Sequence, residues 1–140
     1  MHMMSLFQRL RARMWLLWGL SLNQWGMITS QRWFYTGAIG AFSRAANAWP
    51  GFAEAYLWRG VVRSRELGEP AEGLRDLDTA LLNAPDWAEA YLRRGLLCRF
   101  HGLPSEAASD LRRFLALDLH SPWRGEAERQ LAQLQIEHEE

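Results

Sequence analysis

The sequence has one cysteine, no lysine, and no acidic residue in its first third. The single cysteine, Cys98, excludes an intrachain disulfide and a thiolate metal cluster. Residues 1–50 carry five arginines and no Asp or Glu, whereas residues 51–140 carry eleven arginines and sixteen acids. The two parts therefore have net charges of +5 and −5, although the chain as a whole is neutral. This asymmetry predicts an anionic neighbour, either protein or lipid, for the N-terminal part.

A long uninterrupted apolar run is also missing. The stretch 14–31 has no charged residue, but polar residues such as Ser21, Asn23 and Gln24 interrupt it. A membrane-spanning helix needs about 20 predominantly apolar residues, and the residues that follow Leu22 are a poor signal-peptide cleavage site. We therefore expect neither a span nor a cleaved signal. The predicted location is the cytoplasm, with peripheral attachment to a membrane as the alternative.

The sequence has no recognisable catalytic or cofactor-binding pattern. Its four histidines lie near the termini or at breaks between predicted helices, without the spacing of metal ligands. No glycine-rich phosphate loop is present, and Cys98 falls on the apolar side of its helix. We predict that the chain is not an enzyme, and we expect no catalytic residue, cofactor, metal or small-molecule substrate.

The strongest internal signal is a repeat. The octet Ala53–Gly60 recurs as Ala88–Gly95 with seven identities in eight at a spacing of 35 residues. Each copy reads as two helices, the first over 52–67 and 87–101 and the second over 70–83 and 104–119. Glycine inside a helix costs about 1 kcal/mol relative to alanine. Its recurrence at Gly60 and Gly95 predicts a close helix approach there, with Ala80 as the small partner in the first copy.

This pattern resembles the tetratricopeptide repeat (TPR) family, in which an aromatic and a Leu-Gly-like pair precede small residues and a closing proline. Tyr56, Gly60, Ala80 and Pro85 fill the pattern in one unit, and Tyr91, Gly95, Ala107 and Pro122 fill it in the next. Phe114 departs from it, because a small residue is usual there. The resemblance implies an all-α solenoid of about three helix-turn-helix repeats with a C-terminal capping helix. The predicted segments are a basic amphipathic helix (1–18), a degenerate first repeat (19–52), a second repeat (53–87), a third repeat (88–123) and a cap with tail (124–140).

An arginine and an aspartate occur together in the second and third repeats and are both missing from the first. Arg59 and Arg94 occupy equivalent positions in the first helices of their repeats, and Asp76 and Asp110 occupy equivalent positions in the second helices. The degenerate copy has lost both, with Trp25 and Ala41 in their places. We therefore predict an ion pair between the arginine and the aspartate of each repeat.

The resemblance also implies a concave groove lined by the first helix of each repeat. Its predicted lining is Asn23, Met27 and Ser30, then Leu57, Val61, Ser64 and Arg65, then Leu92, Leu96 and Arg99. Repeats that clamp the carboxylate of chaperone tails carry lysine and asparagine at such positions, so the leucines here argue against a clamp. The groove would instead receive an apolar helix or an extended peptide of another protein. The alternative is that these leucines pack against the capping helix.

The N-terminal segment provides a second candidate surface, which we call the N-terminal docking face. Its apolar members are Leu6, Phe7, Leu10, Met14, Leu17 and Trp18, and its basic members, predicted on the other side, are Arg9, Arg11 and Arg13. The helix could fold back and cover the open end of the array. It could otherwise dock on an anionic membrane surface or on a membrane protein complex, as in an accessory subunit or assembly factor. Nucleic acid is not expected as a partner, because the whole chain is not basic.

Overall fold

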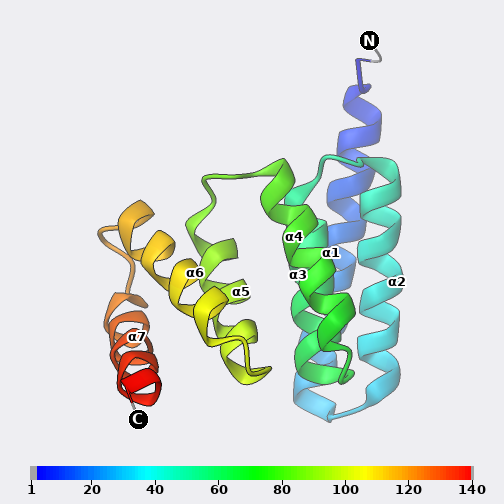
Figure 1. Ribbon diagram of the computed structural model, residues 1–140. Coiled ribbons are helices and arrows are strands. Elements are labelled where there is room, and N and C mark those ends of the chain that lie inside the picture. The colour runs from blue at the N-terminus through cyan, green and yellow to red at the C-terminus, as the bar shows by residue number, and fades with distance from the viewer. Residues whose placement is uncertain (1–2, 140) are drawn as a thin grey trace. The chain divides into compact units, whose positions relative to one another are not determined.

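The computed structural model describes residues 3–139, which contain helices and no strand. The elements are α1 (Leu6–Thr29), α2 (Arg32–Ala48), α3 (Ala53–Glu66), α4 (Pro70–Asn83), α5 (Ala88–Phe100), α6 (Pro104–Leu117) and α7 (Arg124–Glu139) (Figure 1). They form two compact units, one ending at Ala84 and the other beginning at Pro85. The predicted all-helical repeat architecture is confirmed.

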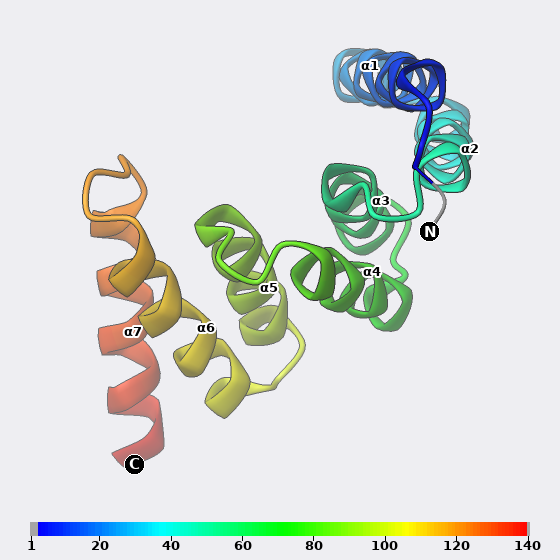
Figure 2. The ribbon, with the colours of Figure 1, turned by 90° about the horizontal axis from the view of Figure 1, so that it is seen from above.

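The first unit consists of two helix pairs, α1 with α2 and α3 with α4, and α2 also packs against α3 (Figure 2). Its core centres on Phe42, which is fully buried together with Ala38 and Ala45 of the same helix. α1 contributes the buried Ala12 and Leu16 to this core. The degenerate first repeat is therefore a real helix pair.

α1 is one continuous helix of 24 residues and runs across the predicted border between residues 18 and 19. A capping box fixes its start: the Ser5 hydroxyl accepts from the Gln8 amide, and the Gln8 side chain accepts from the Ser5 amide. Gly19 lies inside the helix and does not break it. A Cβ atom at this position would lie 2.6 Å from the Phe42 ring. Gly19 instead makes room for that ring.

In the second pair the helix backbones meet at two glycines. A Cβ atom at Gly60 would lie 2.8 Å from the carbonyl oxygen of Gly73, and one at Gly73 would lie 2.8 Å from that of Gly60. The close approach predicted at Gly60 is therefore present, but its small partner is Gly73 rather than Ala80. The reason is that α4 crosses α3 nearer to its own start, while Ala80 is buried further along α4.

The predicted ion pairs are confirmed in both repeats. Arg59 donates to both carboxylate oxygens of Asp76 at 3.0 and 2.7 Å, and Arg94 donates to both of Asp110 at 2.8 Å. Both aspartates are nearly buried, at 4% and 5% exposure. A buried carboxylate of this kind needs such bidentate partners, because an unpaired charge in the interior is strongly destabilising.

The two arginines also lie against the repeat tyrosines. The guanidinium carbon of Arg59 is 5.4 Å from the ring centre of Tyr56, and that of Arg94 is 5.7 Å from the ring centre of Tyr91. The Tyr91 hydroxyl in turn donates to the carbonyl oxygen of Pro85 at 2.8 Å. Tyr56, Arg59 and Asp76 are thus linked within the second repeat, and Tyr91, Arg94 and Asp110 within the third, while the Tyr91–Pro85 bond joins the two sides of the border between these repeats.

The second unit is the α5–α6 pair with α7 packed against α6. α7 buries Ala127 and Leu134 and leaves Arg129 and Gln133 exposed. Arg124, at its start, donates to the carbonyl oxygens of Leu115 and Asp118 at 2.7 and 2.8 Å. The helix therefore covers one side of the last repeat, as a cap would.

Gly60→Ala should destabilise the first unit by about 1–2 kcal/mol, because the added methyl group meets a backbone carbonyl and the overpacking outweighs the gain in helix propensity. Gly40→Ala is the matched control: Gly40 lies in the middle of α2, and a Cβ atom there would meet nothing within 4 Å. It should stabilise by about 0.5–1 kcal/mol. Urea unfolding followed by circular dichroism measures both, and equal effects would contradict the close contact.

Candidate functional site

The structure places the predicted groove residues of the first unit in different environments. On α3, Leu57 is fully buried and Val61 is 7% exposed, so both belong to the interior. Ser64 donates its hydroxyl to the Gly60 carbonyl oxygen at 2.9 Å, while Arg65 is exposed. The apolar character that suggested a groove lining at positions 57 and 61 instead reflects burial in the core.

The three groove positions of α1 are accessible. Asn23 is half-buried, and Met27 and Ser30 are exposed. Ser30 is also the C-cap of α1, with a left-handed φ of 56° and an amide that donates to the Gly26 carbonyl oxygen at 2.7 Å. Its position is therefore explained by the end of the helix.

On α5, Arg99 holds the capping helix. It donates to the backbone carbonyl oxygen of Gln130 at 2.9 Å and to the Glu137 carboxylate at 3.4 Å. The side chain is 17% exposed. Arg99 therefore has a structural role in this state, which corrects the expectation that it lines a free groove.

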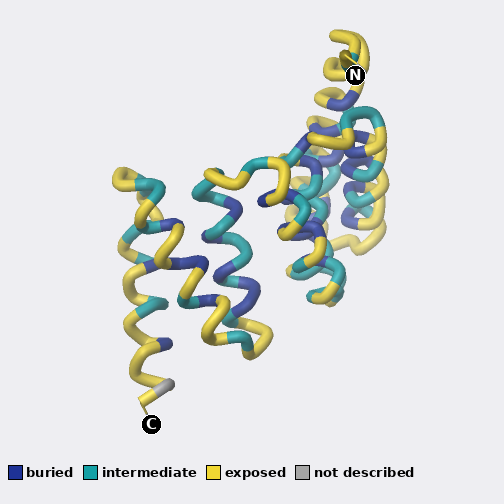
Figure 3. The backbone as a smooth tube through the Cα atoms, turned by 45° about the horizontal axis from the view of Figure 1, so that its top comes forward, coloured by how far each residue is buried: buried dark blue, intermediate teal, exposed yellow. Residues whose placement is uncertain are grey.

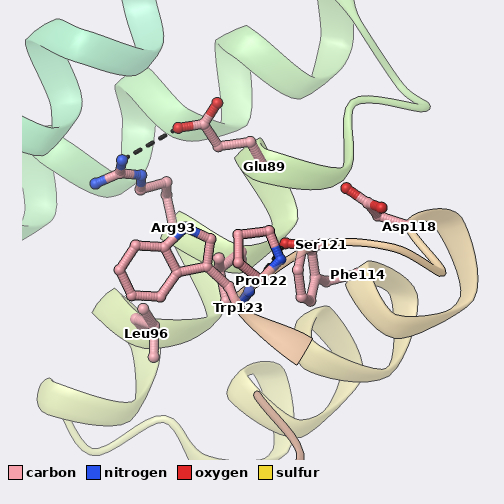
Figure 4. Close-up of a pocket in the computed structure, with 9 residues that line it drawn as sticks. Glu89, Arg93, Leu96, Phe114, Asp118, Ser121, Pro122 and Trp123 are labelled. Atoms are coloured by element: carbon pink, nitrogen blue, oxygen red, sulfur yellow. Dashed lines mark hydrogen bonds and ion pairs between the residues drawn. The ribbon is translucent and has the colours of Figure 1, made fainter. Parts of the chain in front are cut away.

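The other two groove positions of α5 line a cavity in the second unit. Leu92 is nearly buried and Leu96 is half-buried, and both border a hollow of about 300 Å³. Its full lining is Glu89, Leu92, Arg93, Leu96, Phe114, Asp118, Ser121, Pro122 and Trp123 (Figure 4). We call this hollow the α5 pocket.

The α5 pocket has an apolar interior and a charged rim. Phe114 is 2% exposed and contributes buried surface, whereas Trp123 is 60% exposed at the edge. At the rim, Arg93 pairs with Glu89 at 3.1 Å, an interaction drawn in Figure 4, and Asp118 adds a second carboxylate. Such a combination suits an apolar side chain that enters the pocket while its neighbours contact polar groups.

Sequence reasoning found only part of this pocket. It named Leu92 and Leu96 but missed four residues of the connection between α6 and α7, which are Asp118, Ser121, Pro122 and Trp123. The available signal was Phe114, an aromatic residue at a position where the repeat pattern has a small one. In the structure, Phe114 fills the α6 side of the pocket.

The N-terminal docking face is exposed along one side of α1. The exposed fractions of its apolar residues are 74% for Leu6, 75% for Phe7, 52% for Leu10, 71% for Met14, 64% for Leu17 and 56% for Trp18. No described residue before Ala12 is buried, and the first turns of α1 extend beyond the end of α2 (Figures 1 and 3). These six apolar side chains are therefore uncovered within residues 3–139, whereas Ala12 and Leu16 of the same segment pack into the core of the first unit.

The arginines of this face were predicted on the side of α1 opposite its apolar residues, and the structure does not place them there. The opposite side of α1 carries Ala12, Leu16, Gly19 and Gly26 and is buried. Arg9, Arg11 and Arg13 are exposed. Arg9 also lies over the Trp49 ring at 5.4 Å. α1 thus has a second, exposed apolar face in addition to its buried one.

Among the side chains that the structure describes, no group of three His, Cys, Asp or Glu could hold a metal ion. Within residues 3–139, no helix combines the length and the apolar content required to cross a bilayer.

No family model and no curated protein sequence matches the chain. Its structure is similar to the first TPR domain of Spaghetti (RPAP3) bound to the HSP90 peptide SRMEEVD, with 21% identity, coverage of 94% of this chain and 96% of that chain, and a TM-score of 0.81. The Arabidopsis OM64 TPR domain is 21% identical, with coverage of 90% of this chain and 98% of that chain and a TM-score of 0.77. The TPR2B domain of yeast Sti1 in complex with an Hsp70 peptide is 17% identical, with coverage of 91% of this chain and 98% of that chain and a TM-score of 0.77. The chain therefore has the TPR fold.

Two adjacent leucines of α1 test which of its apolar faces supports the fold. Leu16→Ala should cost about 2–4 kcal/mol of unfolding free energy, since Leu16 is 6% exposed and its loss leaves a cavity. Leu17→Ala should change stability by less than about 0.5 kcal/mol, because Leu17 is 64% exposed. Thermal and urea unfolding would measure both, and a larger loss for Leu17→Ala would reverse the assignment of the faces.

Proposed function

We propose that this chain, which has the TPR fold, is a non-catalytic interaction module that holds an apolar helix or peptide of another protein in the α5 pocket. The observation that supports this most directly is the pocket itself. It lies on the first helix of a repeat, where such arrays hold ligands, and Leu92 and Leu96 line it. The proposal includes no catalytic role and no nucleic-acid partner.

The chemistry of the pocket selects among peptides. The structurally similar first TPR domain of Spaghetti (RPAP3) is bound to a peptide with consecutive acids, SRMEEVD. In this chain the pocket rim carries two carboxylates, Glu89 and Asp118, against one guanidinium, Arg93, which already pairs with Glu89. Two rim acids disfavour an acidic peptide, since like charges repel. We infer that the ligand places a leucine or an aromatic side chain in the pocket and that its flanking residues are neutral or basic.

Trp123 is the residue on which a pocket ligand would depend most. It is large, 60% exposed and at the pocket edge, and tryptophan is among the residues that dominate binding energies. Peptides can be selected from a displayed library against the whole chain and their affinities measured by fluorescence anisotropy. Trp123→Ala should weaken binding at least about tenfold, whereas Leu119→Ala should change it less than about twofold.

Leu119 is a matched control, because it is 66% exposed in the same connection and does not line the pocket. Selected peptides should be apolar, without the acidic ends of the chaperone tails. Binding that is unaffected by Trp123→Ala and by Leu96→Gln would show that the ligand lies elsewhere. Selection of acidic peptides alone would contradict the inferred preference.

A second candidate function rests on the N-terminal docking face. Its six exposed apolar side chains form a surface that soluble monomers rarely leave uncovered. We propose as the alternative that the chain is an accessory subunit or assembly factor that docks on a membrane protein complex through this face. Its location would then be cytoplasmic and peripheral to the membrane.

Point variants test this alternative better than a deletion does. Removing residues 1–18 would also remove Ala12 and Leu16 from the core and would disturb the fold. The double variant Leu10→Gln with Leu17→Gln changes only exposed side chains. Affinity capture from detergent-solubilised membranes should recover subunits of one complex with the wild-type chain and with Leu119→Gln, but not with the double variant. Equal recovery by all three proteins would exclude the face as the docking site.

A further inference from the structure

The exposed face of α1 is longer than the N-terminal docking face. Beyond Trp18, the exposed Trp25 and Ile28 continue it at helical spacing, with exposed fractions of 55% and 65%. The apolar stripe therefore runs along almost the whole helix of 24 residues, a length of about 36 Å at 1.5 Å per residue. It is the outer surface of a single helix, and Arg11, Met14, Trp15 and Trp18 line an open hollow on it.

Arginines border this stripe on both edges. Arg11 follows Phe7 by four residues and precedes Trp18 by seven, so it lies along one edge. Arg13 follows Leu10 by three residues and precedes Leu17 by four, which places it along the other edge. Both are exposed, and neither forms an ion pair within residues 3–139. Long cationic side chains in this position can reach past an apolar layer to a layer of negative charge.

A second copy of the chain is a poor occupant for this stripe. Two α1 faces packed together would bring two helices of charge +3 against each other, since α1 carries Arg9, Arg11 and Arg13 and no acid. The acidic α7 would match in charge, but it offers one large exposed apolar residue, Ile136, against eight along the stripe of α1. Neither α1 nor α7 of a second copy therefore complements the stripe in both charge and polarity.

We propose that the exposed face of α1 binds directly to an anionic lipid surface, with the helix axis parallel to the membrane plane. The stripe would enter the boundary between headgroups and acyl chains, to a depth of about 5–10 Å. Trp18 and Trp25 suit that boundary, because the indole ring is apolar and its N–H is a donor. Arg11 and Arg13 would contact lipid phosphates, and the continuous lack of acids in residues 1–50 removes any local repulsion.

This inference is independent of the α5 pocket, which belongs to the second unit. It differs from the alternative function in its ligand, because lipid alone would be sufficient for binding. A protein partner needs a matching shape, whereas a bilayer accepts a convex helix with mixed Leu, Met, Phe and Trp side chains. The edge arginines then favour anionic over neutral headgroups.

The test is flotation of the whole chain with vesicles of phosphatidylcholine alone or with one-third phosphatidylserine. Partitioning should be at least tenfold stronger on the anionic vesicles and should weaken with added salt. Arg11→Gln with Arg13→Gln should lower it by roughly fivefold for each arginine. Leu10→Gln with Leu17→Gln should abolish detectable flotation. The paired control, Arg112→Gln with Leu119→Gln, changes exposed residues outside α1 and should stay within twofold of the wild type.

Far-ultraviolet circular dichroism should be the same for all variants, since only exposed side chains change. Equal partitioning on both vesicle types, or none on either, would overturn the proposal. Binding to a solubilised membrane complex without vesicle binding would overturn it in favour of a protein ligand. Concentration-dependent dimers that disappear in the Leu10→Gln, Leu17→Gln variant would overturn it in favour of a second copy.

Discussion

A glycine at the contact between the two helices is the constraint on which each helix pair depends. At Gly60 and Gly73 the two helices approach so closely that neither position has room for a methyl group. This contact brings the middle of α3 against α4 and so places Arg59 within reach of Asp76. In the second unit, a Cβ atom at Gly95 would lie 3.1 Å from Cβ of Asp110, and Arg94 bonds that same aspartate. The ion pair is therefore a consequence of the helix approach as well as a support for it.

The first helix pair solves the same packing problem with different residues. Gly19 and Gly26 of α1 receive the rings of Phe42 and Tyr35 from α2. In this pair an aromatic ring fills the space beside each glycine. In α3 and α4 the two glycine backbones touch, so no such space exists. Burial of Tyr35, together with the nearby Glu66 carboxylate, raises the pKa of its phenol. The ring-on-glycine contacts, together with the loss of the arginine and the aspartate, explain why the first repeat is hard to recognise from its sequence.

Much of the fold could be predicted because it repeats within the chain. The octet around Tyr56 and Tyr91 defined the helix pairs, and the joint loss of arginine and aspartate in the first copy predicted the ion pairs. The candidate surfaces were harder, because hydrophobic spacing identifies an apolar face without showing what covers it. α1 is apolar on two faces, and only the structure shows that Leu16 is buried and Leu17 exposed. For the same reason Leu57 was expected in a groove but lies in the core.

The overhanging start of α1 bears on how any ligand would be bound there. No described residue before Ala12 is buried, so the first turns have little tertiary support. A short helix in water is only marginally stable, because ordering its backbone costs conformational entropy. The hydrogen bonds between Ser5 and Gln8 at the first turn offset part of that cost before a ligand arrives. The capping box therefore preorganises the recognition surface: a ligand meets a helix already formed, and less of its binding energy is spent on folding the segment it contacts.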